Sequence, residues 1–260
     1  MSDATDFLLS DEEIANFIAE GYHILEPELP ADMNDSVCAE AKEMDGAFGI
    51  LEAIPRLADV YSTPEVVGAL TSILGTDYEM DKSRVLHVNP AGSRSQTWHQ
   101  DGTNVRHHQV WCVLAMYFPH DTSTDMGPTI IMPGTHLRNA PTDRLASYAN
   151  IVGQVPLAVK AGTVAITHYD LWHTATRNKS DTDRLMIKFL FNRISEPSEP
   201  SWNSTPELAA CAAGGVLKKQ VGTKGYTSDY YKEWELRREM WNWMIGEPVE
   251  IPPGAYRTML

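Results

Sequence analysis

The chain has 260 residues, enough for one sizeable domain with a full hydrophobic core. A formal net charge of −14 argues against nucleic-acid and anionic-membrane partners, because binding phosphates requires a basic surface. No apolar run reaches the about 18 residues of a membrane span, no signal-peptide pattern opens the chain, and three widely spaced cysteines suggest reduced thiols, so we expect a cytoplasmic protein.

The first 80 residues are expected to be mostly helical. Ser10 followed by three acidic residues is a typical helix start, and Asp32 or Asn34 is the expected cap of the second helix. Residues 45–57 show no clear hydrophobic period. The predicted elements are three amphipathic helices and one short strand, the helices over residues 10–21, about 31–44 and 63–75, and the strand over residues 22–25.

The middle of the chain changes to short β-rich runs separated by Gly and Pro turns. The predicted strands cover residues 84–89, 110–118, 129–132, 155–159, 163–167 and 185–194. This spacing predicts a mainly β protein with flanking helices, built on a double-sheet jelly roll or barrel. With no internal repeat or linker, we expect a single domain over residues 1–260. It would comprise a helical part (1–80), a jelly-roll core (81–195) and a C-terminal extension (196–260), in which the second part of residues 226–243 is expected to be helical.

The sequence Trp-His-Gln-Asp-Gly contains a candidate metal-binding pair, His99 and Asp101. Residues i and i+2 of an extended chain point to the same side, so both side chains can hold one ion. Two histidines and one carboxylate form the facial set that suits non-haem Fe(II) and leaves coordination positions open. A third ligand is therefore expected from a distant histidine.

Among the remaining histidines, His168 and His173 are the two main candidates, because both follow the strand predicted over residues 163–167. Arg184 begins the last predicted strand, eleven residues after His173. A buried arginine near a metal suits a planar carboxylate, which it binds through two parallel hydrogen bonds. From the residues alone, a surface arginine after the polar run of residues 178–181 is the favoured interpretation of position 184.

The order of these motifs resembles the phytanoyl-CoA dioxygenase family of Fe(II)- and 2-oxoglutarate-dependent oxygenases. The motifs are Trp98–Asp101, then Gly127–His136, then His173 and Arg184, and the segment from Leu9 to Tyr22 is similar to the opening helix of that family. The resemblance covers roughly residues 8 to 195. It implies the cupin-like form of the jelly roll, a double-stranded β-helix.

The resemblance implies a role for several residues. His99, Asp101 and His173 take the metal-ligand positions, and Arg184 takes the position that binds the distal carboxylate of 2-oxoglutarate. His87 and Gln100 fall where a contact with the cosubstrate is expected, and His168 becomes a packing residue.

The chain departs from many relatives at one position. Ala175 stands where they carry a serine two residues after the distal histidine, so Thr174 or Thr176 is the expected substitute.

The implied function is oxidation of a small organic molecule, expected to be a hydroxylation, with Fe(II) as cofactor and 2-oxoglutarate and O2 consumed to give succinate and CO2. Asp101 favours hydroxylation, desaturation or ring formation over halogenation, because related halogenases lack this carboxylate. The acidic charge argues against coenzyme A thioesters as substrates. A non-catalytic cupin-like binding protein and a zinc hydrolase are the alternatives, and neither needs a carboxylate-binding arginine at position 184.

Overall fold

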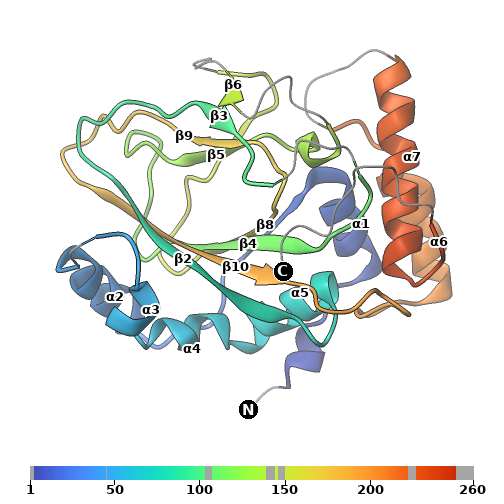
Figure 1. The fold of residues 1–260 in the computed structure, drawn as a ribbon, viewed down its shortest axis with the longest axis horizontal. Helices are drawn as coiled ribbons and strands as arrows, with labels where there is room; N and C mark the ends of the chain where they lie inside the picture. The colour runs from blue at the N-terminus through green and yellow to red at the C-terminus, as the bar shows by residue number, and fades with distance from the viewer. Residues whose placement is uncertain are drawn as a thin grey trace.

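The computed structural model describes residues 3–44, 46–102, 107–138, 144–145, 150–221 and 227–249 (Figure 1). The helices are the short 3-10 turns η1 (Ala4–Phe7), η2 (Thr135–Leu137) and η3 (Val216–Lys218), and α1 (Asp11–Glu20), α2 (Met33–Lys42), α3 (Ile50–Ala53), α4 (Leu57–Tyr61), α5 (Pro64–Leu74), α6 (Pro206–Gly215) and α7 (Thr227–Met244). The strands are β1 (Tyr22–Leu25), β2 (Glu79–Asn89), β3 (Trp98–His99), β4 (Cys112–Tyr117), β5 (Thr129–Ile131), β6 (Arg144–Leu145), β7 (Val155–Pro156), β8 (Val164–His168), β9 (His173–Ala175) and β10 (Arg184–Asn192).

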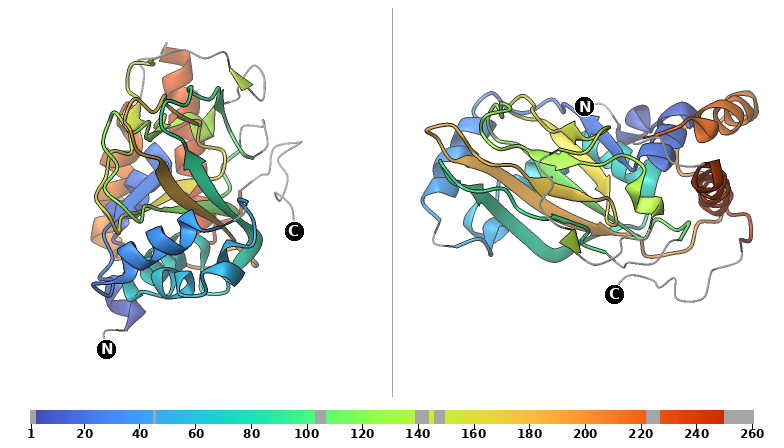
Figure 2. Two further views of the ribbon diagram at one scale, coloured as in Figure 1. Left: turned by 90° about the vertical axis from the view of Figure 1, so that its left-hand side faces the viewer. Right: turned by 90° about the horizontal axis from the view of Figure 1, so that it is seen from above.

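Two antiparallel sheets of five strands form the centre of the molecule. The larger sheet has the order β1-β8-β4-β10-β2 and the smaller has the order β6-β3-β9-β5-β7. Figure 2 shows the two sheets packed face to face, with α2 to α5 beneath the larger one. The predicted mainly β fold with flanking helices is confirmed, as a jelly-roll sandwich whose sheets do not close into a barrel.

The strand period of two separates the side chains of the larger sheet into two layers. On β10, Leu185, Ile187, Phe189 and Phe191 join the core that includes α4 and α5. The alternate residues, beginning with Arg184, lie on the opposite face, toward the smaller sheet, where an inner cluster consists of Met116, Phe118, Ile131, Leu157, Ala165, Leu171 and Met186. The inner face of β10 therefore carries polar side chains into the space between the sheets.

The predicted start of the first helix at Ser10 and its predicted end at Gly21 are both confirmed. Ser10 and Glu13 form a capping box on α1, and Gly21 ends that helix with a φ of 85°. The second helix is shorter than expected, and the Asp32 side chain makes no capping hydrogen bond. The short helices α3 and α4 lie in the stretch of residues 45–57 and just beyond it, where no period was visible, because one or two turns are too short to show one.

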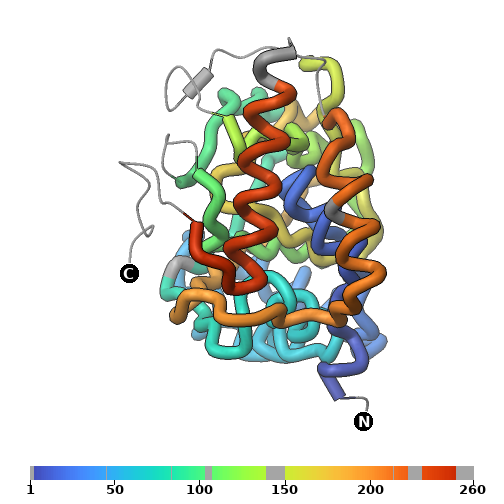
Figure 3. Tube along the Cα trace, turned by 90° about the vertical axis from the view of Figure 1, so that its right-hand side faces the viewer, coloured from blue at the N-terminus to red at the C-terminus, as the bar shows by residue number. Residues whose placement is uncertain are grey.

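The C-terminal part adds two helices at one end of the sandwich. Figure 3 shows α6 and α7 side by side there, next to α1. The helix expected in the second part of residues 226–243 is confirmed as α7, although residue 226 itself and residues 250–260 lie outside the described part. Helix α6 was not predicted. Within the described ranges, no helix combines the length and apolar character needed to cross a bilayer.

Candidate metal and cosubstrate site

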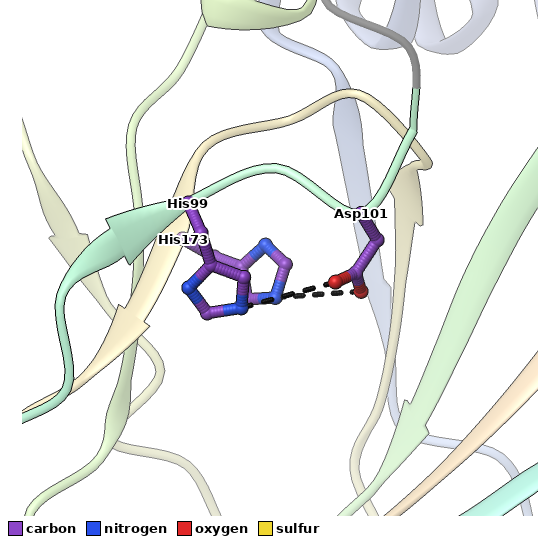
Figure 4. Close-up of side chains that lie close together, drawn as sticks. All are labelled: His99, Asp101 and His173. Atoms are coloured by element: carbon purple, nitrogen blue, oxygen red, sulfur yellow. Dashed lines mark ion pairs between the residues drawn. The ribbon is translucent and has the colours of Figure 1, made fainter. Parts of the chain in front are cut away.

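The short pairing between β3 and β9 brings together two histidines that are 74 positions apart in the chain. His99 lies directly opposite His173 in the antiparallel register, and their ring centroids are 4.3 Å apart. Asp101 follows β3 by two residues, and its carboxylate faces both rings (Figure 4). His99 Nε2 lies 3.8 Å from Asp101 Oδ1, and His173 Nε2 lies 3.6 Å from Asp101 Oδ2.

Hydrogen bonds orient both imidazoles in the same way. The Nδ1 of His99 lies 2.9 Å from the carbonyl oxygen of Thr97, and the Nδ1 of His173 lies 3.0 Å from that of Leu171. A neutral ring that donates through Nδ1 keeps the lone pair of Nε2 for a metal. In both rings this nitrogen is the one that faces Asp101. The separations from Asp101 fit a common ion, because two ligand atoms each about 2.1 Å from one metal lie at most about 4.2 Å apart.

The local charges favour the protonation states that metal binding requires. Burial lowers the pKa of His173 to about 4, so this ring is neutral near pH 7. Burial alone would raise the pKa of Asp101, but His173, Lys188 and His99 together hold it below its ordinary value. A neutral imidazole and an ionised carboxylate are the forms that ligate metals.

Arg184 is buried close to this group and is only partly satisfied. Its exposed fraction is 2%, and its one recorded hydrogen bond is a 3.3 Å contact from Nη2 to the carbonyl oxygen of Gly127. The Nε and Nη1 groups have no partner among the described residues, and burial lowers the pKa of the guanidinium to about 10. The arginine at position 184 is therefore an interior residue, not a surface one.

A cavity of about 50 Å³ joins Arg184 to the two histidines. His87 lines it too, with an unpartnered Nε2 and a pKa that burial lowers to about 4. The guanidinium and the two candidate histidine ligands therefore line one cavity, as binding of a chelating dicarboxylate would require.

Thr174 and Thr176, the expected substitutes for the missing serine, both already use their hydroxyls in hydrogen bonds to backbone carbonyls. The hydroxyl of Thr174 donates to the carbonyl of Gln96, and that of Thr176 donates to Pro128. Thr129 was not considered from the sequence, although it lies opposite Ala175 on the adjacent strand and lines the cavity.

His168 lies in a separate buried group instead of in the candidate site. It is the last residue of β8, and its Nδ1 accepts a hydrogen bond from the backbone N–H of Asp170. The Asp170 carboxylate is 3.0 Å from His107 Nε2. A Cβ added to Gly102 would lie 2.0 Å from Asp170 Oδ1, so this glycine lets the segment that carries Asp101 approach.

Gln100, His107 and His108 are not among the residues that line the cavity. The side chain of Gln100 accepts a hydrogen bond from Trp172 Nε1 at 3.0 Å, and Gln100 is absent from the cavity wall. His107 and His108 are both buried. The Nε2 of His107 lies 3.0 Å from Asp170 Oδ2, and the Nδ1 of His108 lies 3.5 Å from Glu239 Oε2.

Lys188 is the main site residue that the sequence prediction missed. Its Nζ lies 2.7 Å from Asp101 Oδ2, and its side chain is 16% exposed. The signal was available, because Lys188 and Arg184 are four residues apart on one predicted strand and must share a face. The contact was not predicted because Lys188 is far from the His-x-Asp motif in the sequence.

The family model described as Phytanoyl-CoA dioxygenase (PhyH) matches residues 4–186. The uncharacterized protein Rv1501 of Mycobacterium tuberculosis is 33% identical over 158 residues, and the uncharacterized protein Mb1539 of Mycobacterium bovis matches equally. The aligned part is 57% of this chain and 57% of each relative, so the match spans little more than half the length of these curated relatives.

Three solved structures show the same fold at low sequence identity. The non-heme monooxygenase ThoJ is 18% identical, with a TM-score of 0.58 over 92% of this chain and 98% of that one. The carbocyclase SnoK of nogalamycin biosynthesis is 18% identical, with a TM-score of 0.57 over 86% and 97%. The epimerase SnoN, in complex with Fe3+, alpha ketoglutarate and nogalamycin RO, is 17% identical, with a TM-score of 0.57 over 83% and 96%.

Proposed function

Because the chain belongs to the phytanoyl-CoA dioxygenase family, we propose that it is an iron(II)- and 2-oxoglutarate-dependent oxygenase acting on a small organic molecule. His99, Asp101 and His173 would hold the metal. When bound, iron supplies the oxygen and one-electron chemistry that no side chain can provide. The carboxylate Asp101 occupies the position that a halide would need, which favours an oxidation of the substrate without halogen transfer.

The observation that carries the proposal is the unsatisfied guanidinium of Arg184 in the wall of the cavity that the two histidines share. A charged arginine with two free N–H groups is costly to bury unless an anion joins it. The distal carboxylate of 2-oxoglutarate would accept those hydrogen bonds in a two-pronged contact. A zinc hydrolase or a simple binding protein has no need for this group beside its metal.

Further residues of this chain would orient the cosubstrate and exclude water. Thr129 would donate its hydroxyl to the same distal carboxylate, in the role of the serine replaced by Ala175. His87, neutral near pH 7, would offer one more hydrogen bond in the cavity. The apolar side chains of Met116 and Met186 also line the cavity and would help to exclude water around the bound cosubstrate.

The type of oxidation differs among the similar structures. The three similar structures include a monooxygenase, a carbocyclase and an epimerase, so one fold carries several outcomes. We propose hydroxylation, because it is the simplest outcome when Asp101 keeps its coordination position. The substrate would be a small molecule and not a nucleic acid, given the acidic composition.

The proposal is tested by the conversion of 2-oxoglutarate to succinate in the purified protein. We expect slow, substrate-independent succinate release that requires both iron(II) and oxygen and that disappears in Arg184→Ala. Arg177→Ala is a matched control, because Arg177 is an exposed arginine of the neighbouring segment. Equal succinate release from the wild type and Arg184→Ala, or none from iron-loaded wild type, would contradict the proposal.

A further inference from the structure

Lys188 is a nearly buried cation whose hydrogen-bonding capacity is mostly unused. Its ammonium group has three donors. Asp101 accepts one of them, and the described residues provide no other hydrogen-bond partner. A buried ammonium with free N–H groups is unfavourable unless another acceptor is supplied.

The position of Lys188 on β10 separates it from the cosubstrate end of the cavity. Arg184 and Lys188 point to the same side of the strand and are about 13 Å apart along it, at about 3.3 Å for each residue. Lys188 touches Asp101, whereas Arg184 lies at the far end beside Gly127. If Arg184 holds the distal carboxylate of 2-oxoglutarate, Lys188 lies four residues farther along β10, beside the candidate ligand Asp101, where we expect the substrate to be bound.

The charges around the site do not balance without one more anion. Arg184 and Lys188 are the two lysine or arginine residues in the described cavity wall, which contains no carboxylate, and Asp101 is the acid beside it. Iron(II) and Arg184 would contribute three positive charges, and Asp101 and the 2-oxoglutarate dianion would contribute three negative charges. Lys188 therefore leaves one positive charge uncompensated in a largely buried space, where such a charge is costly.

We propose that Lys188 is a substrate-binding residue and that the substrate carries an anionic group, a carboxylate in the simplest case. This inference rests on the proposed function, because the charge count includes iron and 2-oxoglutarate. One N–H of Lys188 keeps its bond to Asp101, and the remaining donors bind the substrate anion. The substrate carbon to be oxidised is thereby held beside the metal ligands.

Acetate and its neutral analogue acetamide probe the proposed anion site. If the proposed function holds, the anaerobic protein with iron(II) and 2-oxoglutarate should have a visible charge-transfer band, and each probe is titrated while the band is recorded. We expect acetate, but not acetamide, to shift the band of the wild type and of Lys188→Arg. In Lys188→Met the apparent acetate affinity should fall about tenfold or more, because a hydrogen bond to a charged group is lost. Lys82→Met, which removes an exposed lysine of the adjacent strand β2, should behave as wild type.

Three results would overturn the proposal while leaving the proposed function intact. The first is an equal acetate affinity in the wild type and Lys188→Met, which would mean an adventitious additive only. The second is a wild-type band that acetate does not shift. The third is loss of the band itself in Lys188→Met, since Lys188 would then serve to position Asp101 for the metal. Absence of the band in the wild type, by contrast, would remove the proposed function and this proposal with it.

Discussion

Replacing Arg184 with methionine should make the ligand-free protein more stable while abolishing its stabilisation by 2-oxoglutarate. The guanidinium is 2% exposed, and two of its three nitrogens lack a partner among the described residues. Such a group is retained for binding and not for folding. Methionine is flexible enough to fill much of the same space without a charge.

The size of the effect follows from the pKa of Arg184. Burial lowers it from 12.5 to about 10, and each pKa unit corresponds to about 1.36 kcal/mol, so the charged form costs the folded state about 3 kcal/mol. The folded-state pKa lies below the unfolded value, so this cost is fully present at any pH below about 10. Loss of the hydrogen bond to Gly127 offsets about 1 kcal/mol, which leaves a net stabilisation of about 2 kcal/mol.

Urea unfolding at pH 7 measures this difference, with and without 2-oxoglutarate in the presence of iron(II) under anaerobic conditions. The wild type should gain stability on addition of 2-oxoglutarate, and Arg184→Met should not. Arg177→Met, at an exposed position, should change neither value. An Arg184→Met protein that is less stable than wild type and is still stabilised by 2-oxoglutarate would refute the reasoning.

Three further predictions concern the groups around the site. Burial holds the pKa of His136 and His168 at about 3, whereas the unfolded chain protonates near 6.5, so stability should fall as the pH drops from 6.5 toward 3. At pH 5 each histidine should lower the free energy of unfolding by about 2 kcal/mol relative to pH 7. Equal urea midpoints at the two pH values would contradict this prediction. Gly102→Ala should weaken iron(II) binding and cost about 1–3 kcal/mol of stability, because the added Cβ would lie 2.0 Å from Asp170 Oδ1. Calorimetric titration measures the iron(II) affinity, and urea unfolding measures the stability. Unchanged values in both would exclude the clash. His173→Ala should lose iron(II) affinity in the same titration while His168→Ala retains it, and the reverse order would mean that the wrong histidine was assigned.

The strand-rich core was predictable because its signals are local. The β10 run is long and mostly apolar, and the turn at Gly127-Pro128 is marked by residue types that favour turns. The helices that were missed are α3, α4 and α6, which are short or have a weakly amphipathic sequence. Their formation depends on packing against other parts of the chain, which local periodicity does not report.

The candidate site was only partly predictable, for a similar reason. The His-x-Asp pair and Arg184 stand out through their residue types and spacing, and the resemblance to a family selected His173 over His168. Lys188 and Thr129 reach the site through strand pairing between distant segments. The sequence pattern predicts which face of the sheet each side chain occupies, but not which residues of other strands lie beside it.

The central claim is that His99, Asp101 and His173 hold iron together with 2-oxoglutarate. The measurement is the visible charge-transfer band of the anaerobic protein after addition of iron(II) and 2-oxoglutarate. It is recorded for wild type, for His173→Ala and for the control His23→Ala. His23 lies on β1, in the other sheet. The account predicts the band in wild type and in His23→Ala, and no band in folded His173→Ala. A band of full strength in His173→Ala, or none in folded wild type, would contradict it.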